Sequence, residues 1–202
     1  MTSWDERFRD EEYPQNPNPS PVLERYLSEI PDGRALDVAT GTGRNAVFLA
    51  ADGYEVDAVD QSREGLRITQ ENAASRGVES RLNLVQADIP TYRFPTDAYD
   101  LITVSFYRVI DRFPDLKEAL KEGGYLFVEH HLRSDEATPS GPSDDRYRFG
   151  ANELLQACLD MTVLYYDAGV EERADDKRRT TARILARNTH GQRQSYPTRR
   201  RG

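Results

Sequence analysis

Apolar positions along the chain follow two spacings, one typical of strands and one of helices. Short apolar runs predict five strands, at 35–38, 55–60, 82–88, 99–106 and 125–132. Apolar residues three or four positions apart predict the intervening helices, at 21–30, 45–51, 63–76 and 113–121. Because strands and helices alternate, the pattern predicts a parallel sheet covered by helices on both faces.

The last third of the chain has a different pattern. A long surface loop over 133–150 precedes a predicted helix at 152–160 and two predicted strands at 162–166 and 180–186. A short polar connection joins these strands, so we expect an antiparallel hairpin at the sheet edge. The predicted fold class is therefore α/β, a doubly wound (Rossmann-like), seven-stranded, mostly parallel sheet with a C-terminal antiparallel β-hairpin.

The ends of the chain differ from this body. We predict an N-terminal arm or flap at 1–19, one domain at 20–187 and a basic, disordered tail at 188–202. Ser20 is a predicted helix N-cap before Pro21, and Ser62 is another. Trp4 and Phe8 lie close to one helical face with Tyr13, so the arm either packs onto the body or forms a flap over a ligand.

Composition narrows the classes of function. A net charge of −8 makes nucleic acid an unlikely partner, because phosphate binding requires excess Lys and Arg. The four arginines of the tail need no partner at a solvated terminus. No apolar run is long enough to span a membrane, and one cysteine provides neither an internal disulfide nor the usual zinc site. We expect a cytoplasmic monomer or homodimer with no bound metal.

The segment 35–46, Ala-Leu-Asp-Val-Ala-Thr-Gly-Thr-Gly-Arg-Asn-Ala, carries the clearest chemical signal. Gly41 and Gly43 allow a sharp turn close to a ligand, and the following helix N-terminus suits an anionic group. Asp37 is unusual, because a carboxylate in an apolar strand is costly unless it is paired. We interpret the segment as a nucleotide-cofactor loop.

Two more acids follow predicted strands, at the sheet edge where doubly wound folds bind ligands. Asp60 can accept hydrogen bonds from both ribose hydroxyls, and Asp88 can accept one from the amino group of adenine. Helix capping or solubility is the alternative explanation for each acid.

Two cofactors remain in competition. Gly41, Gly43 and Ala46 also satisfy the dinucleotide fingerprint, with Asp60 at about the expected distance. A pyrophosphate would be repelled by the carboxylate of Asp37, whereas an ammonium and a sulfonium would be attracted. S-adenosylmethionine, which carries both cations with an adenosine, therefore fits better than a nicotinamide dinucleotide.

The segments 36–46, 48–50, 53–56 and 58–60 together resemble the class I S-adenosylmethionine-dependent methyltransferases, and most closely their small tellurite-resistance-type members. The resemblance implies that the loop holds the methionine end of the cofactor, Asp60 the ribose, and Asp88 with Ile89 the adenine. The implied cofactor-binding residues are Asp37, Ala39, Gly41, Gly43, Arg44, Asp60, Gln61, Asp88, Ile89 and Ser105. Ala39 departs from the glycine usual in the family.

The methyl acceptor is less defined by the sequence. We predict methyl transfer to a small molecule, with a non-catalytic S-adenosylmethionine-binding protein and an NAD(P)-dependent oxidoreductase as alternatives. Candidate acceptor-binding residues are Tyr13, Tyr107, Arg108 and His130, and no catalytic base is identified. Strand alternation directs His130 and His131 to opposite faces, so at most one faces the acceptor. Arg108 either binds an anion or pairs with Asp111.

Overall fold

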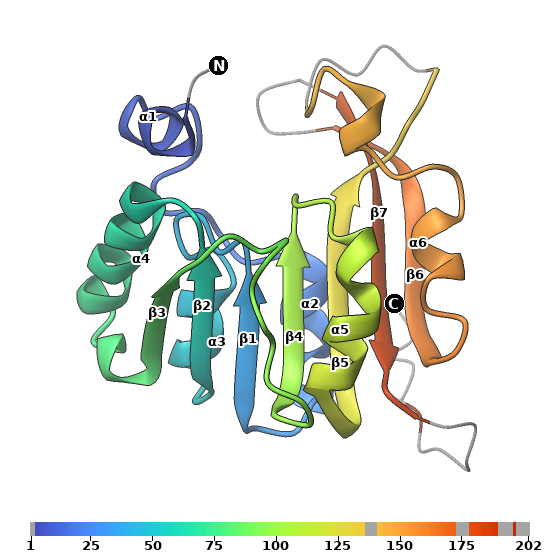
Figure 1. Cartoon of the computed structure of the whole chain (residues 1–202), viewed down its shortest axis with the longest axis horizontal. Helices are drawn as coiled ribbons and strands as arrows, with labels where there is room; N and C mark the ends of the chain where they lie inside the picture. Colours follow the sequence, from blue (N-terminus) through green and yellow to red (C-terminus); the bar gives the residue numbers. More distant parts are fainter. Residues whose placement is uncertain (1–2, 136–140, 173–177, 190–195, 197–202) are drawn as a thin grey trace.

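Seven strands make up one sheet in the computed structural model, which describes residues 3–135, 141–172, 178–189 and 196. The strands are β1 (Arg34–Val38), β2 (Glu55–Asp60), β3 (Leu82–Gln86), β4 (Tyr99–Ser105), β5 (Leu120–His131), β6 (Thr162–Glu172) and β7 (Arg178–Arg187). Their order is β3-β2-β1-β4-β5-β7-β6; β7 runs antiparallel to β5 and β6, and the other neighbouring pairs are parallel (Figure 1). The predicted fold class is confirmed.

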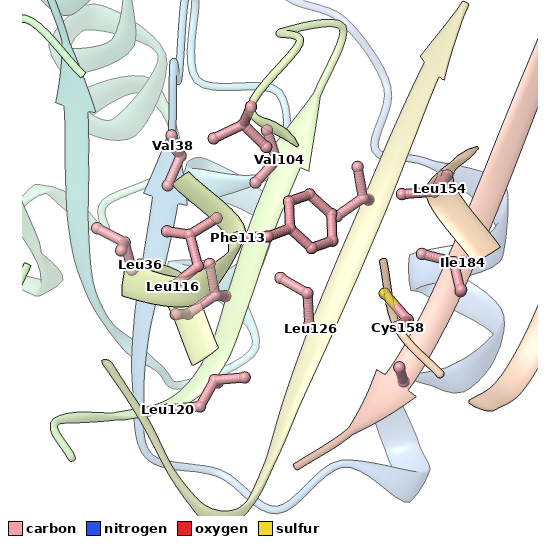
Figure 2. Packing of buried hydrophobic residues seen from close by; sticks show 14 of the residues in the cluster. Leu36, Val38, Val104, Phe113, Leu116, Leu120, Leu126, Leu154, Cys158 and Ile184 are labelled. Atoms are coloured by element: carbon pink, nitrogen blue, oxygen red, sulfur yellow. The ribbon is translucent and has the colours of Figure 1, made fainter. Parts of the chain in front are cut away.

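Helices cover both faces of this sheet. They are α1 (Trp4–Arg9), α2 (Pro21–Tyr26), α3 (Ala46–Ala51), α4 (Arg63–Ser75), α5 (Phe113–Ala119) and α6 (Glu153–Gln156). In Figure 1, α2 and α3 lie behind the sheet and α5 and α6 in front, while α1 lies above α4 at the carboxyl ends of the strands. Figure 2 shows the core on the α5 and α6 face, where Phe113 and Leu116 pack over Leu126 and Val104.

The antiparallel hairpin is longer than its apolar pattern predicts. β6 continues to Glu172 instead of ending at Tyr166, and β7 extends to Arg178 and Arg187. The additional length is polar: Glu171 lies opposite Arg179 in the ladder and forms an ion pair with it. Hydrophobic periodicity does not detect a strand whose cross-strand pairs are charged.

Several predicted boundaries were also wrong by a few residues. α5 ends at Ala119, because Leu120 is already extended and pairs with Tyr99, so β5 begins there and not at residue 125. β3 ends at Gln86, which places Asp88 in the following loop. The helix predicted over 152–160 is only the short α6, preceded by Asn152 in the left-handed region.

The two predicted caps behave differently. Ser62 accepts a hydrogen bond from the backbone N–H of Gly65 and caps α4 as expected. Ser20 stands at the N-cap position of α2 without a side-chain cap, because its hydroxyl donates to Glu129 on β5 at 2.8 Å. A hydrogen bond to a charged carboxylate is stronger than one between neutral groups, which favours this orientation of the Ser20 hydroxyl.

The described residues contain no helix that is long and apolar enough to cross a membrane. Most of the predicted tail, residues 190–195 and 197–202, and the hairpin connection at 173–177 lie outside the described residues.

Candidate active site

The loop between β1 and α3 requires unusual backbone angles at three residues. Ala39, Gly41 and Gly43 have φ values of 55°, 57° and 86°. A Cβ at Gly43 would lie 2.8 Å from Cγ2 of Thr69 and 2.9 Å from Cγ2 of Val47, so only glycine fits there. Ala39 adopts the left-handed region despite its Cβ, at a cost of about 1 kcal/mol.

Asp37 is buried on β1 next to this loop, with 3% of its surface exposed. Its two oxygens accept hydrogen bonds from the hydroxyls of Thr103 and Thr40, each at 2.6 Å. Burial raises the pKa of Asp37 to about 6, against the lowering effect of these hydrogen bonds. All of these donors are neutral, so the structure describes a buried carboxylate without a cation.

Asp60 at the end of β2 is held in the same way. One oxygen accepts from the backbone N–H of Gly41 and the other from that of Ser62, both at 2.8 Å. Burial raises the pKa of Asp60 above its ordinary value, again without a nearby cation. The two carboxylates and the loop thus form one acidic site at the carboxyl ends of β1 and β2.

The remaining predicted cofactor residues lie along the same edge. Gln61 and Asp88 are exposed and Ile89 is buried. Ser105, at the end of β4, is half-buried and accepts a hydrogen bond from Asn45 Nδ2 at 2.9 Å. Arg44 does not point freely from the loop, because its Nη1 donates to Glu129 at 2.7 Å.

The N-terminal arm packs against this loop. Phe8 is 7% exposed, and its ring lies where a Cβ on Gly41 or Gly65 would come within 3.3 Å and 3.1 Å of it. Asp5 accepts from the Ser62 hydroxyl at 2.5 Å, and Thr42 donates to the carbonyl of Pro14 at 2.9 Å. Of the two alternatives for the arm, packing onto the body therefore describes its position, and that position borders the cofactor loop.

A second charged cluster lies on the neighbouring strands β5, β7 and β6 and includes Arg44 of the β1–α3 loop. We call it the arginine–glutamate cluster; its members are Arg44, Glu129, Glu171, Arg179 and Arg183. Glu129 bonds to Arg44 and Arg183, each at 2.7 Å, and Arg183 bonds to Glu171 at 2.6 Å. Burial raises the pKa of Glu129, but the two guanidinium groups outweigh burial and lower it overall.

Phe106 lies beside this cluster, directly after Ser105, with a positive φ of 57°. The guanidinium carbons of Arg44 and Arg179 lie 5.4 Å and 5.0 Å from the centre of its ring, and the His131 ring lies at 5.0 Å. A non-glycine residue held in this backbone region is typical of functional sites.

The four candidate acceptor residues are dispersed. Tyr13 is on the arm, stacked against Trp4 and Phe8. Tyr107 belongs with the acids of the cofactor edge: burial raises its pKa, and Asp88 and Asp60 add to the increase. The structure does not place these two tyrosines together.

Arg108 and His130 lie on the α5 and α6 face. Arg108 pairs with Glu153, not with Asp111, which corrects that alternative. His130 contacts the carbonyl of Tyr147 at 2.7 Å and packs on Phe149. Alternation therefore directs His131, not His130, towards Phe106.

Sequence reasoning missed Glu129, Arg183 and Phe106. Glu129 carried a usable signal, because it is an acid inside the apolar run 125–132, as Asp37 is inside 35–38. Phe106 and Arg183 carried none, since their importance depends on contacts between distant strands.

Comparisons with known proteins agree with this geometry. Residues 35–124 match the family described as "Methyltransferase domain". This match covers less than half of the chain, and it agrees with the resemblance to the class I S-adenosylmethionine-dependent methyltransferases. A ubiquinone/menaquinone biosynthesis C-methyltransferase, UbiE, from Geotalea daltonii is 35% identical over 112 residues, which are 52% of this chain and 48% of the relative. This chain thus matches about half the length of that relative.

Two solved structures share the fold. TehB from Haemophilus influenzae superposes with a TM-score of 0.73 and 22% identity, over 84% of this chain and 62% of TehB. The [4+2]-cyclase SpnF gives a TM-score of 0.64 and 19% identity, over 84% of this chain and 81% of SpnF. The same fold therefore occurs in proteins that carry out more than one type of reaction, so the function has to be inferred from the site.

S-adenosyl-L-methionine is the cofactor of this class, and the acidic site fits it. Asp37 and Asp60 are buried carboxylates with raised pKa values and only neutral donors, which a cationic ligand would stabilise. An anionic pyrophosphate would increase the cost of burying both charges.

Proposed function

We propose that this protein transfers the methyl group of S-adenosylmethionine to a small-molecule acceptor. The observation that carries the proposal is the pair of buried carboxylates, Asp37 and Asp60, without a cation at the carboxyl ends of β1 and β2. The bound cofactor supplies a methyl group on a sulfonium. Within the described residues, the chain contributes the acidic site that binds the cationic methionine end and the ribose.

The histidine next to Phe106 favours a methyl acceptor that loses its proton without help from a general base. Burial lowers the pKa of His131 to about 3, so this histidine is neutral at pH 7 but a weak base. A group with such a pKa accepts a proton poorly from an alcohol or an amine. We therefore expect an acceptor such as a thiol, a phenol or an enol, which loses its proton more readily than an alcohol does.

A small molecule is also the acceptor that the quinone-pathway name of the UbiE relative suggests. That relative matches this chain over the domain only, so its acceptor is a guide to chemical class. Phenolic and quinol compounds therefore belong in the first acceptor panel.

The proposal is tested by incubating the protein with S-adenosylmethionine and a panel of thiols, phenols and enols, and measuring S-adenosylhomocysteine release. Asp60→Ala is the inactive control, after circular dichroism has shown that it folds. Cofactor binding without release on any acceptor would favour the non-catalytic alternative. Binding of NAD without binding of S-adenosylmethionine would contradict the proposal.

A further inference from the structure

Glu129 joins three segments that are distant in the sequence. Its side chain is fully buried on β5. Oε1 accepts from Nη1 of Arg44, and Oε2 accepts from Nε of Arg183 and from the hydroxyl of Ser20, at 2.7, 2.7 and 2.8 Å. One carboxylate therefore connects the cofactor loop, strand β7 and the start of α2.

A second series of hydrogen bonds leads from Glu129 to the same loop. The backbone N–H of Ser20 donates to Asn45 Oδ1 at 3.4 Å, and Asn45 Nδ2 donates to Ser105 at 2.9 Å. The backbone N–H of Phe106 donates to the carbonyl of Glu129 at 2.8 Å. Glu129 is thus linked to both sides of the place that the resemblance gives to the methionine end, the loop and the end of β4.

We propose that Glu129 is a positioning residue for the methionine end of the cofactor, an inference that rests on the proposed function. It holds Arg44 and, through Ser20, Asn45, so that the loop and Ser105 stay in one arrangement. Glu171, the other carboxylate of the cluster, pairs with Arg179 and Arg183, so it does not replace Glu129 at Arg44.

Glu129→Gln tests the positioning role of the carboxylate while it keeps the size and shape of the side chain. The amide keeps the volume, but it removes the charge that both guanidinium groups share and offers one acceptor oxygen instead of two. We expect Arg44 and the loop to lose their fixed position, while the contacts to ribose and adenine, which lie on Asp60 and beyond, remain.

The experiment compares two ligands by calorimetry. S-adenosylhomocysteine contains the amino and carboxyl groups of the methionine end, and 5′-deoxy-5′-methylthioadenosine lacks both. In Glu129→Gln we expect the affinity for the first to fall about tenfold, the effect of losing one charge-assisted hydrogen bond, and that for the second to change less than about twofold.

Asp57→Asn is the matched control. Asp57 is also a buried strand carboxylate, 6% exposed, and accepts from Arg34, Asn83 and Tyr99 at 2.7–2.9 Å. It belongs to a separate network, so Asp57→Asn should destabilise the fold without changing the ratio of the two affinities. A merely structural role for Glu129 predicts the same unchanged ratio.

An unchanged ratio in Glu129→Gln, or an equal loss for both ligands, would overturn the inference. If Glu129→Gln does not fold, Ser20→Ala removes only one of the three contacts, and we expect a change in the same direction of about threefold. Wild-type protein that binds neither ligand would contradict the proposed function as well, whereas tight wild-type binding with an unchanged ratio contradicts only the role of Glu129.

Discussion

Asp37 and Glu129 are both buried strand carboxylates at the carboxyl edge of the sheet, but their surroundings are opposite. Asp37 receives only neutral donors, and burial raises its pKa to about 6. Glu129 lies between Arg44 and Arg183, which lower its pKa. The cofactor side therefore contains a negative charge without a counterion, whereas the charge of Glu129 is compensated by two arginines of the protein.

This difference indicates what each region does. A buried carboxylate that is paired with arginines of the same protein fixes the position of its partners and needs no ligand. A buried carboxylate without a cation reduces stability and is retained where a ligand compensates it. This reasoning supports the proposal that a cationic ligand compensates the cost at Asp37.

The largest effect on stability should come from removing the charge of Glu129. Glu129→Gln leaves Arg44 without its carboxylate and removes one of the carboxylates that pair with Arg183, so the free energy of unfolding at pH 7 should fall by about 3 kcal/mol. Urea denaturation measures it. A loss below about 1 kcal/mol would show that the cluster is solvated and not a rigid element.

The equivalent substitution at Asp37 should raise the stability of the protein instead of lowering it. Asp37→Asn removes an uncompensated buried charge, so the free energy of unfolding should rise by about 1 kcal/mol. The affinity for S-adenosylmethionine should fall at least about tenfold, because the attraction for the cation is lost. Denaturation and calorimetry on the same preparation measure both, and a variant that is less stable yet binds normally contradicts the comparison.

The pH dependence of stability should distinguish the two carboxylates. The folded-state pKa of Asp37 is above its unfolded value of 3.8, so the ligand-free protein binds this proton more tightly when folded. Its contribution to stability should increase by about 1 kcal/mol as the pH falls from 7 to 5 and be absent in Asp37→Asn. Glu129 has the opposite sign: its lowered pKa contributes stability above the ordinary value of 4.5, which is lost below it. Thermal unfolding of the wild-type protein and of Asp37→Asn from pH 7 to 5 tests the sign for Asp37, and unfolding of the wild-type protein below pH 4.5 tests the sign for Glu129.

The smallest predicted effect concerns the loop itself. Ala39→Gly relieves a left-handed φ of 55° and restores the residue usual in the family. Since glycine also gives the unfolded chain more freedom, the net gain in unfolding free energy should be about 0.5 kcal/mol. A loss of stability in differential scanning calorimetry would show that the alanine methyl group makes a packing contact that outweighs the strain.

The sequence predicted the fold wherever burial produces a periodic pattern. The parallel strands and the acids at their ends could be located because a buried strand with a carboxylate is conspicuous. The same argument applied to the run 125–132 would have found Glu129. It could not assign partners, because the contacts of Glu129 with Arg44 and Arg183 span 85 and 54 residues.

Two further errors have physical causes of the same kind. The end of β6 is stabilised by charged cross-strand pairs such as Glu171 with Arg179, which no apolar pattern records. Ser20 looked like a helix cap until the fold brought a buried carboxylate to its hydroxyl. Local chemistry is predicted well from sequence when no distant group competes for it.

Proton release on binding is the sharpest test of whether Asp37, a carboxylate without a cation partner, binds a cationic cofactor. At pH 6 about half of Asp37 is protonated in the ligand-free protein, so S-adenosylmethionine should displace about half a proton per site. Calorimetry in buffers with different ionisation enthalpies measures this number. We expect release of about half a proton at pH 6 in the wild-type protein and none at that pH in Asp37→Asn. Proton uptake, or release that is the same in Asp37→Asn, would contradict the account.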